Sequence, residues 1–162
     1  PLPPNIERII RRPPTGMVES RQKLVNLVAE VVMRTGCTYD QVALCGFSQG
    51  SMSAMDAALA LEHKVAGVVM LGGAPIAMDV WRQRLQAEQH CGIRVLISHG
   101  RQDRVLPYMG AEWNEKLLDD AGAYSTFHPH DDGHNLGPPH VLEEVCKFWN
   151  SLVPEKNTGG SD

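Results

Sequence analysis

The stretch Gly46-Phe47-Ser48-Gln49-Gly50 decides how the chain folds around it. It follows a short apolar run, 41–45, and precedes an alanine-rich stretch, 51–61, whose small side chains can pack closely on all sides. Glycines on both sides of a serine let a strand and a helix approach at a tight turn without colliding side chains. The pattern therefore predicts a strand, a sharp turn that carries the serine, and a buried helix.

Strands and helices alternate on both sides of this turn. Apolar residues at helical spacing predict amphipathic helices, and short β-branched runs without polar alternation are typical of strands covered on both faces. The predicted strands are 41–45, 65–71, 93–98 and 124–128, and the predicted helices are 17–33, 51–61, 81–89, 108–121 and 141–152. This alternation predicts one α/β domain with a parallel sheet, over residues 16–153.

The two ends of the chain differ from this domain in composition. The first 14 residues hold five of the 11 prolines, which predicts an extended surface segment over 1–15. Residues 154–162 are polar and are expected to form a flexible tail.

Composition excludes several classes of function. The net charge is −4 and the 15 Lys and Arg residues are scattered, so we expect no binding to nucleic acid or to an anionic membrane. The longest charge-free apolar stretch, 65–78, has 14 residues and four helix breakers, against the ~20 residues that a spanning helix needs. The four cysteines form no CxxC pair and lie mostly in apolar runs, where a thiol acts as a small hydrophobe. The residues from Pro1 onward show no signal peptide, and a cytoplasmic location is expected.

Ser48 is the candidate nucleophile. Its pattern alone arises by chance in roughly one chain in twenty of this length, but here it follows a predicted strand and opens a predicted helix. A serine hydroxyl needs a base within hydrogen-bond reach and a carboxylate that orients this base. Asp103 and His134 follow the predicted strands 93–98 and 124–128, at the edge where parallel sheets build their sites. We therefore predict a triad of Ser48, Asp103 and His134.

The other histidines receive structural interpretations. His63 and His90 lie at predicted helix ends, where surface histidines complement the helix dipole. His99 is expected to order the loop of Asp103. The remaining three, which compete with His134 for the role of base, are interpreted as surface or capping residues: His128, His130 and His140.

Three local motifs resemble one known family. They are the stretch 46–50, His99-Gly100-x-x-Asp103 with Pro107 close behind, and Gly133-His134, spaced by 55 residues from serine to aspartate and by 31 from aspartate to histidine. In these motifs the chain, from about residue 16 to 153, is similar to the acyl-protein thioesterase and carboxylesterase (phospholipase/carboxylesterase) family of α/β-hydrolases. The resemblance implies the α/β-hydrolase fold, a mostly parallel sheet with helices on both faces.

Two departures from the family pattern stand out. The family normally has a third glycine where this chain has Ser51, a change that a close-packed helix should tolerate. Members also begin with several strands, one followed by a His-Gly loop that supplies an N–H to the oxyanion hole. No counterpart precedes Gly16, so we expect the fold to lack its N-terminal strands.

The resemblance implies an acyl-enzyme mechanism on carboxylic esters or thioesters. Ser48 would attack the carbonyl, and the Gln49 N–H would bind the oxyanion. Pro75, Leu106 and Met109 are expected to contact the acyl group. No cofactor and no metal is expected, the substrate is a small-molecule or lipid-modified protein ester or thioester, and a homodimer is compatible with the sequence.

Two alternatives remain at this stage. The run His128-Pro129-His130-Asp131-Asp132-Gly133-His134 resembles a metal-hydrolase motif, but an extra glycine breaks its register. The second alternative is a catalytically impaired pseudo-hydrolase or truncated isoform that acts as a binding protein, since one oxyanion donor has no counterpart.

Overall fold

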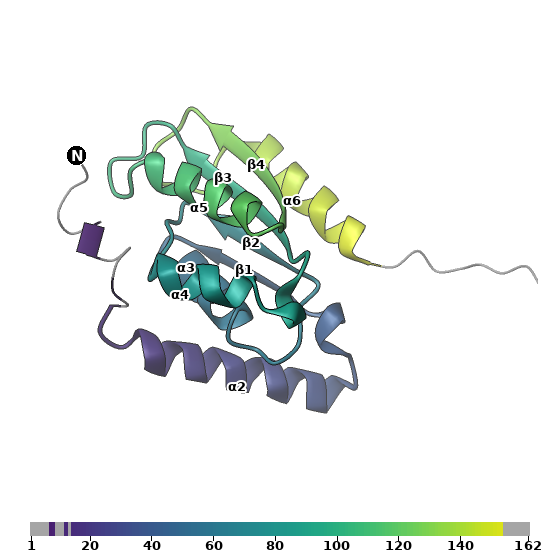
Figure 1. The fold of residues 1–162 in the computed structure, drawn as a ribbon. Coiled ribbons are helices and arrows are strands. Elements are labelled where there is room, and N and C mark those ends of the chain that lie inside the picture. The colour runs from purple at the N-terminus through teal and green to yellow at the C-terminus, as the bar shows by residue number, and fades with distance from the viewer. Residues whose placement is uncertain (1–6, 9–11, 13, 154–162) are drawn as a thin grey trace, which may run out of the picture.

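The computed structural model describes residues 7, 8, 12 and 14–153 (Figure 1). Its sheet has the order β1-β2-β3-β4, and each neighbouring pair is parallel. The strands are β1 (Ala43–Phe47), β2 (Gly67–Leu71), β3 (Arg94–Gly100) and β4 (Tyr124–His130). The helices are α2 (Met17–Thr35), α3 (Gln49–Ala58), α4 (Met78–Leu85), α5 (Met109–Asp120) and α6 (Pro139–Leu152), with short 3-10 turns η1 (Tyr39–Gln41) and η2 (Glu88–His90). The predicted α/β fold with a parallel sheet is confirmed.

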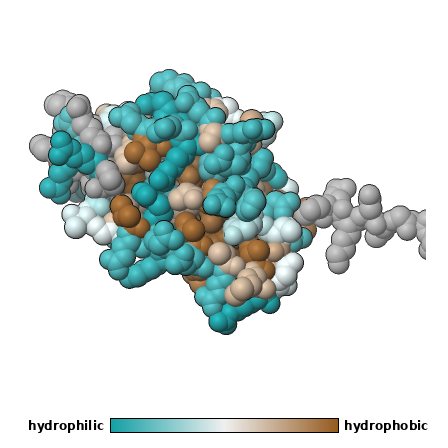
Figure 2. Space-filling model, turned by 60° about the horizontal axis from the view of Figure 1, so that its bottom comes forward, coloured by the Kyte–Doolittle hydropathy of each residue, from teal (hydrophilic) through white to brown (hydrophobic). Residues whose placement is uncertain are grey.

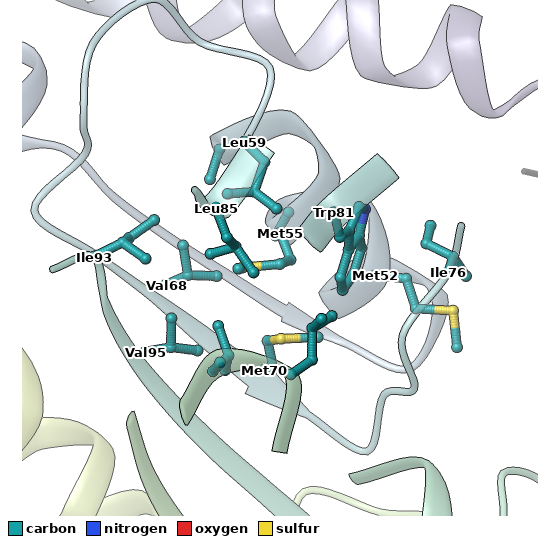
Figure 3. Close-up of a cluster of buried hydrophobic side chains, with 14 of the residues drawn as sticks. Met52, Met55, Leu59, Val68, Met70, Ile76, Trp81, Leu85, Ile93 and Val95 are labelled. Atoms are coloured by element: carbon teal, nitrogen blue, oxygen red, sulfur yellow. The ribbon is translucent and has the colours of Figure 1, made fainter. Parts of the chain in front are cut away.

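Helices cover both faces of the sheet, as the sequence predicts. On one face α3, α4 and α5 bury the larger core, which includes Met55, Trp81 and Val95 (Figure 3). On the other face α6 alone packs over β2, β3 and β4 through Val141, Val145 and other residues. Full burial of each large apolar side chain contributes about 1.5–3 kcal/mol, so the two cores fix the layers.

Helix α2 lies outside the first layer and packs on α3 (Figure 1). Only Met17 and Val28 of this helix are buried. Apolar groups therefore show between polar ones on the face seen in Figure 2, and the exposed large apolar residues of α2 are Val18, Leu27, Val31 and Met33. Among the described residues, no helix combines the length and apolar character needed to span a bilayer.

The cysteines lie closer to the surface than the apolar runs around them indicate. All four are free, and Cys45, Cys91 and Cys146 are exposed. Cys45 is exposed because β1 is an edge strand and α6 packs on β2, β3 and β4, so the odd-numbered positions of β1 lack a full cover. A strand that reads as continuous apolar sequence is therefore only half covered.

Several predicted boundaries shift. The strand predicted over 41–45 begins and ends two residues later, and β4 extends two residues further than predicted, through Pro129. Proline is tolerated there because β4 is an edge strand. The helix predicted over 81–89 divides into α4 and η2. His90, which was predicted at the surface, is 1% exposed. Burial lowers the pKa of His90, and the positive charges of Arg84 and Lys64 lower it further.

The predicted terminal segments are described only in part. Residues 154–162 lie outside the described residues, as do most of the proline-rich residues 1–15. Glu7 and Arg8 are helical rather than extended, in the proline-free stretch 5–12.

One buried carboxylate joins three helices. Asp56 of α3 is 1% exposed and accepts hydrogen bonds from Arg21 of α2 (2.5 Å) and from Trp81 (2.9 Å) and Arg84 (3.4 Å) of α4. A buried carboxylate is tolerated only when its oxygens are paired in this way. Asp56 therefore fixes α2 and α4 against α3.

Replacement of Asp56 by Ala should lower the free energy of unfolding by about 2–4 kcal/mol. The indole N–H loses its acceptor, and the two guanidinium groups lose their counter-charge but are partly exposed and can reach water. Urea denaturation followed by circular dichroism measures the change. The matched control is Asp120→Ala, which removes an exposed ion pair with Lys116 and should cost less than about 0.5 kcal/mol. Equal effects of the two changes would contradict this assignment.

The turn between β1 and α3 requires one of its two glycines. A Cβ on Gly46 would lie 2.3 Å from the carbonyl carbon and oxygen of Gly50 and 2.5 Å from the Ser51 nitrogen. These atoms are all backbone and cannot move aside. A Cβ on Gly50 itself would meet nothing within 4 Å. The close approach of strand and helix thus depends on Gly46.

Gly46→Ala should destabilise the fold by about 3 kcal/mol or more, because strand and helix must separate. Gly50→Ala should leave stability unchanged or raise it by up to about 1 kcal/mol, because alanine is the better helix former. Thermal and urea unfolding of both variants measure the difference. Similar losses in the two variants would disprove this account of the turn.

Candidate active site

Ser48 lies in the turn after β1 with a backbone conformation that L-residues rarely adopt. Its φ is 53° and its ψ is −124°, and it is one of two described non-glycine residues with positive φ. Such a conformation costs on the order of 1–3 kcal/mol. The turn is held by the Ser48 N–H, which donates to the Leu71 carbonyl at 2.8 Å, and by the Ser51 hydroxyl, which donates to the Ser48 carbonyl at 2.7 Å.

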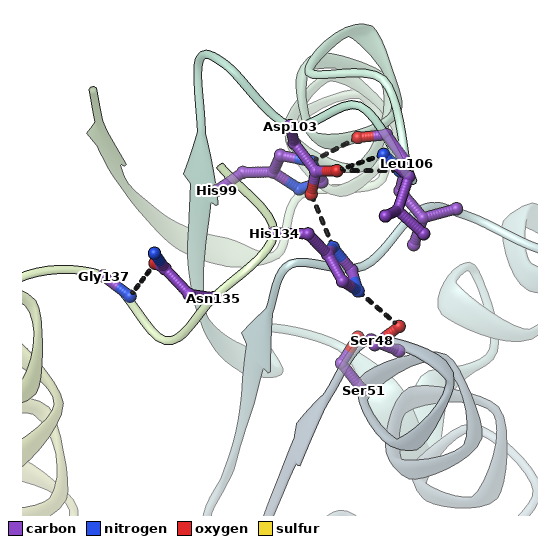
Figure 4. A network of polar contacts seen from close by, with 9 residues as sticks. Ser48, Ser51, His99, Asp103, Leu106, His134, Asn135 and Gly137 are labelled. Atoms are coloured by element: carbon purple, nitrogen blue, oxygen red, sulfur yellow. Dashed lines mark hydrogen bonds and ion pairs between the residues drawn. The ribbon is translucent and has the colours of Figure 1, made fainter. Parts of the chain in front are cut away.

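The three residues of the predicted triad form one hydrogen-bonded chain (Figure 4). The His134 Nδ1 lies 2.7 Å from Asp103 Oδ2, and its Nε2 lies 2.9 Å from Ser48 Oγ. A carboxylate only accepts, so Nδ1 carries the hydrogen and Nε2 can accept the hydroxyl proton of Ser48. This tautomer suits a base that activates a hydroxyl.

Asp103 accepts three hydrogen bonds and lies beside a fourth nitrogen, that of His99. Its Oδ1 accepts the amide N–H groups of Val105 and Leu106, each at 2.8 Å, and its Oδ2 faces His134 and, at 3.2 Å, the Nε2 of His99. Burial by itself raises the pKa of Asp103, but the hydrogen bonds from His134 and the two amides outweigh it, so the pKa lies below its usual value. The carboxylate is therefore ionised at neutral pH, although its side chain is 1% exposed.

The loop that carries His134 is joined to the end of β3 by backbone contacts. The Arg101 N–H donates to the His130 carbonyl at 2.7 Å, and the Gln102 N–H donates to the Asp132 carbonyl at 3.1 Å. A Cβ on Gly100 would lie 2.2 Å from the Asp132 oxygen, so this approach also requires a glycine. The Asp103 and His134 loops are thus positioned by one another.

Further contacts frame the imidazole. The Phe47 ring lies 4.8 Å, centroid to centroid, from the ring of His134. Gly72 follows β2 with φ 58°, and a Cβ there would lie 3.0 Å from Phe47 and 3.7 Å from His134. Next to it, a Cβ on Gly73 would lie 2.0 Å from Ser51 Oγ. The serine that replaces the family's third glycine is therefore accommodated by a glycine on the neighbouring loop.

Gln49, the predicted oxyanion donor, is the first residue of α3. The amide of a first helical residue has no acceptor within its own helix, and the positive end of the helix dipole lies at the same place. Its N–H is thus available beside Ser48.

The predicted acyl contacts lie on two adjoining segments. Pro75 is buried in the loop after β2, and Met109 begins α5 with 44% of its surface exposed. A Cβ on Gly110 would lie 2.8 Å from the Ala74 Cβ, so these segments touch. The Leu106 side chain instead belongs to the larger core. Contacts of Pro75, Leu106 and Met109 with an acyl group remain predictions.

The metal-hydrolase alternative gains no support. His134 points to Asp103 and Ser48, whereas His130 is buried with its Nδ1 3.9 Å from Asp132. Among the described residues, no group of three or more His, Cys, Asp or Glu side chains is placed to share an ion.

Some residues of this site carry no signal in the sequence. Phe47 and Gly100 stand inside the quoted motifs, but their contacts with His134 and with the 132–133 carbonyls join segments more than 30 residues apart. His99 was expected to order the loop of Asp103, and it does contact Asp103. The sequence did not predict that His99 and His134 both lie beside Oδ2 of this carboxylate.

Comparisons with known proteins indicate one family. The sequence profile of the phospholipase/carboxylesterase family matches residues 11–153. Acyl-protein thioesterase 1 of Eremothecium gossypii is 33% identical over 97 residues, 60% of this chain and 40% of that protein. Lysophospholipase-like protein 1 of Mus musculus is 32% identical over 143 residues, 87% of this chain and 59% of that protein.

Solved structures give the same fold. The crystal structure of esterase PE8 has a TM-score of 0.75 and 27% identity, over 85% of this chain and 62% of that chain. SOBER1 of Arabidopsis thaliana has a TM-score of 0.75 and 20% identity, over 84% of this chain and 64% of that chain. Each of these four proteins is longer, so this chain spans about 40–64% of their lengths. With a family profile matched over nearly the whole chain, the protein belongs to the phospholipase/carboxylesterase family of α/β-hydrolases.

Proposed function

We propose that the protein is a serine hydrolase that cleaves carboxylic esters or thioesters through an acyl-enzyme on Ser48. The observation that carries the proposal is the continuous hydrogen-bonded chain from Ser48 through His134 to Asp103, with 2.9 and 2.7 Å between the bonded atoms. Membership of the phospholipase/carboxylesterase family supports the ester and thioester class. Two relatives, named as an acyl-protein thioesterase and a lysophospholipase-like protein, support it further.

The proposed reaction follows from the tautomer of His134. Ser48 Oγ attacks the carbonyl carbon while Nε2 takes the hydroxyl proton, and Asp103 stabilises the resulting imidazolium. The imidazolium then returns the proton to the leaving alcohol or thiol, which leaves an acyl group on Ser48. Water, deprotonated by the same Nε2, attacks this acyl-enzyme and releases the acid.

Charge develops on the carbonyl oxygen during both steps. The Gln49 N–H at the start of α3 is the proposed donor to this oxygen, and the helix dipole adds to its effect. One lost donor of this kind costs on the order of 10²- to 10³-fold in rate. Among the described residues the Gln49 N–H is the one donor proposed for this role, so the impaired or binding-only protein is the competing hypothesis.

Labelling with a fluorophosphonate probe tests the triad. The wild type should be labelled on Ser48, and mass spectrometry of the peptide that contains 46–50 should locate the adduct. Ser48→Ala should abolish labelling, and His134→Ala should slow it by roughly 10⁴-fold or more, because no base remains to accept the proton.

Ser20→Ala, an exposed serine of α2, is the matched control and should label like the wild type. Equal labelling of all variants would disprove the triad. A folded wild type that is not labelled would favour the binding-only alternative.

Acyl chain preference should depend on Met109. In a panel of esters and thioesters of graded chain length, Met109→Ala should raise KM several-fold for long acyl chains only, because an exposed apolar contact beside the 72–76 loop is lost. The control Met33→Ala removes a methionine of α2 that is more exposed, at 76% against 44%, and should change nothing. An unchanged chain-length profile in Met109→Ala would remove this residue from the proposed binding surface.

The proposed substrate is a small-molecule or lipid-modified protein ester or thioester, and no cofactor takes part in the steps above. A cytoplasmic location and a homodimer are further proposals from the sequence. Cell fractionation and the molar mass in solution test them directly.

A further inference from the structure

His99 is a buried histidine that the reaction above does not use. It is the last residue but one of β3 and is 0% exposed. Its Nε2 lies 2.9 Å from the Leu106 carbonyl oxygen and 3.2 Å from Asp103 Oδ2. Both neighbours are acceptors, so Nε2 must carry a hydrogen; this N–H donates to the Leu106 carbonyl and lies close to Asp103 Oδ2 without a hydrogen bond to it.

This N–H lies close to Asp103 Oδ2, the oxygen that accepts the hydrogen bond from His134. Asp103 Oδ2 lies between the two imidazoles, at 2.7 Å from Nδ1 of one and at 3.2 Å from Nε2 of the other. The other oxygen, Oδ1, is occupied by two amides. An ionised carboxylate offers about four lone-pair sites; three hydrogen bonds occupy three of them, and the His99 nitrogen lies 3.2 Å from Oδ2. His99 therefore affects the orientation of the Asp103 carboxylate. It also affects how strongly the negative charge of this carboxylate interacts with His134.

We propose that His99 is a positioning residue of the triad: through Asp103 it sets the orientation of His134 and the strength with which the carboxylate holds the imidazolium. The proposal rests on the proposed function for its catalytic consequence, but the coupling between the two histidines does not. Loss of the His99 N–H would leave more negative charge on Oδ2, which favours the protonated form of His134.

Other charged and titratable groups surround the pair and stay constant between variants. His130 and Asp132 lie at the end of β4, and Tyr108, with Arg101 over its ring, lies against His99 at 6.2 Å between ring centroids. Substitutions at His99 alone therefore report the effect of its own N–H.

Three substitutions separate the N–H from the ring. His99→Phe keeps a ring but has no donor, and His99→Asn is polar but too short to place a donor at the position of Nε2. His99→Gln places an amide N–H near that position and is the conservative rescue. The NMR titration of the His134 ring, assigned with His134→Gln, is the primary measurement, because it needs a folded chain but no activity.

In His99→Phe and His99→Asn the midpoint of the His134 titration should rise by about half a pH unit or more, and His99→Gln should keep the wild-type midpoint. The acidic limb of kcat/KM should move by the same amount, with kcat lowered roughly tenfold and KM unchanged, because His99 is buried away from substrate.

Midpoints that stay equal in all folded variants would overturn the proposal, even where activity falls, since a structural role alone lowers activity without moving the titration. If His99→Phe does not fold, the titration midpoints of His99→Asn and His99→Gln are compared, and equal midpoints overturn the proposal. A wild type with the predicted titration but without fluorophosphonate labelling would refute the proposed function and leave the coupling intact.

Discussion

At Gly46 the backbone of β1 lies so close to the first turn of α3 that no side chain fits between them, and this contact positions Ser48. With the strand and the helix in contact, the residue that joins them must take a positive φ, and it does so at 53°. Ser48 thereby stands at the carboxyl edge of the sheet and at the N-terminus of a helix. The strain is balanced by hydrogen bonds at both its N–H and its carbonyl.

A second close approach places the partners of the serine. Gly100 ends β3, and the carbonyls of 132 and 133 occupy the space that a side chain would take. Parallel strands end at one edge, so the loops after β1, β3 and β4 meet there. The rigid sheet and two backbone contacts, rather than the loops themselves, set the distances between serine, histidine and aspartate.

The buried carboxylates of Asp56 and Asp103 have different partners and different consequences. Asp56 is paired with Arg21 and Arg84 and with the indole of Trp81, so positive charge close by offsets its own. Asp103 instead accepts hydrogen bonds from two amides and from the His134 imidazole, with the His99 ring 3.2 Å away. Neutral donors satisfy its oxygens without cancelling the charge, which leaves Asp103 able to stabilise an imidazolium. The first arrangement joins helices, and the second suits a proton-transfer site.

The sequence by itself determined the alternation of strands and helices and the turn at Ser48, and it predicted that Asp103 and His134 lie beside this serine. Local rules suffice for these, since periodicity, glycine spacing and chain order act within short segments. The tertiary structure decided which faces are covered: it exposes Cys45 on an edge strand, buries His90, and turns Leu106 into the core. It also decided that the rings of His99 and His134 both lie beside Asp103 Oδ2. The two histidines are 35 residues apart, and their distance depends on the pairing of β3 with β4 and on the close approach at Gly100.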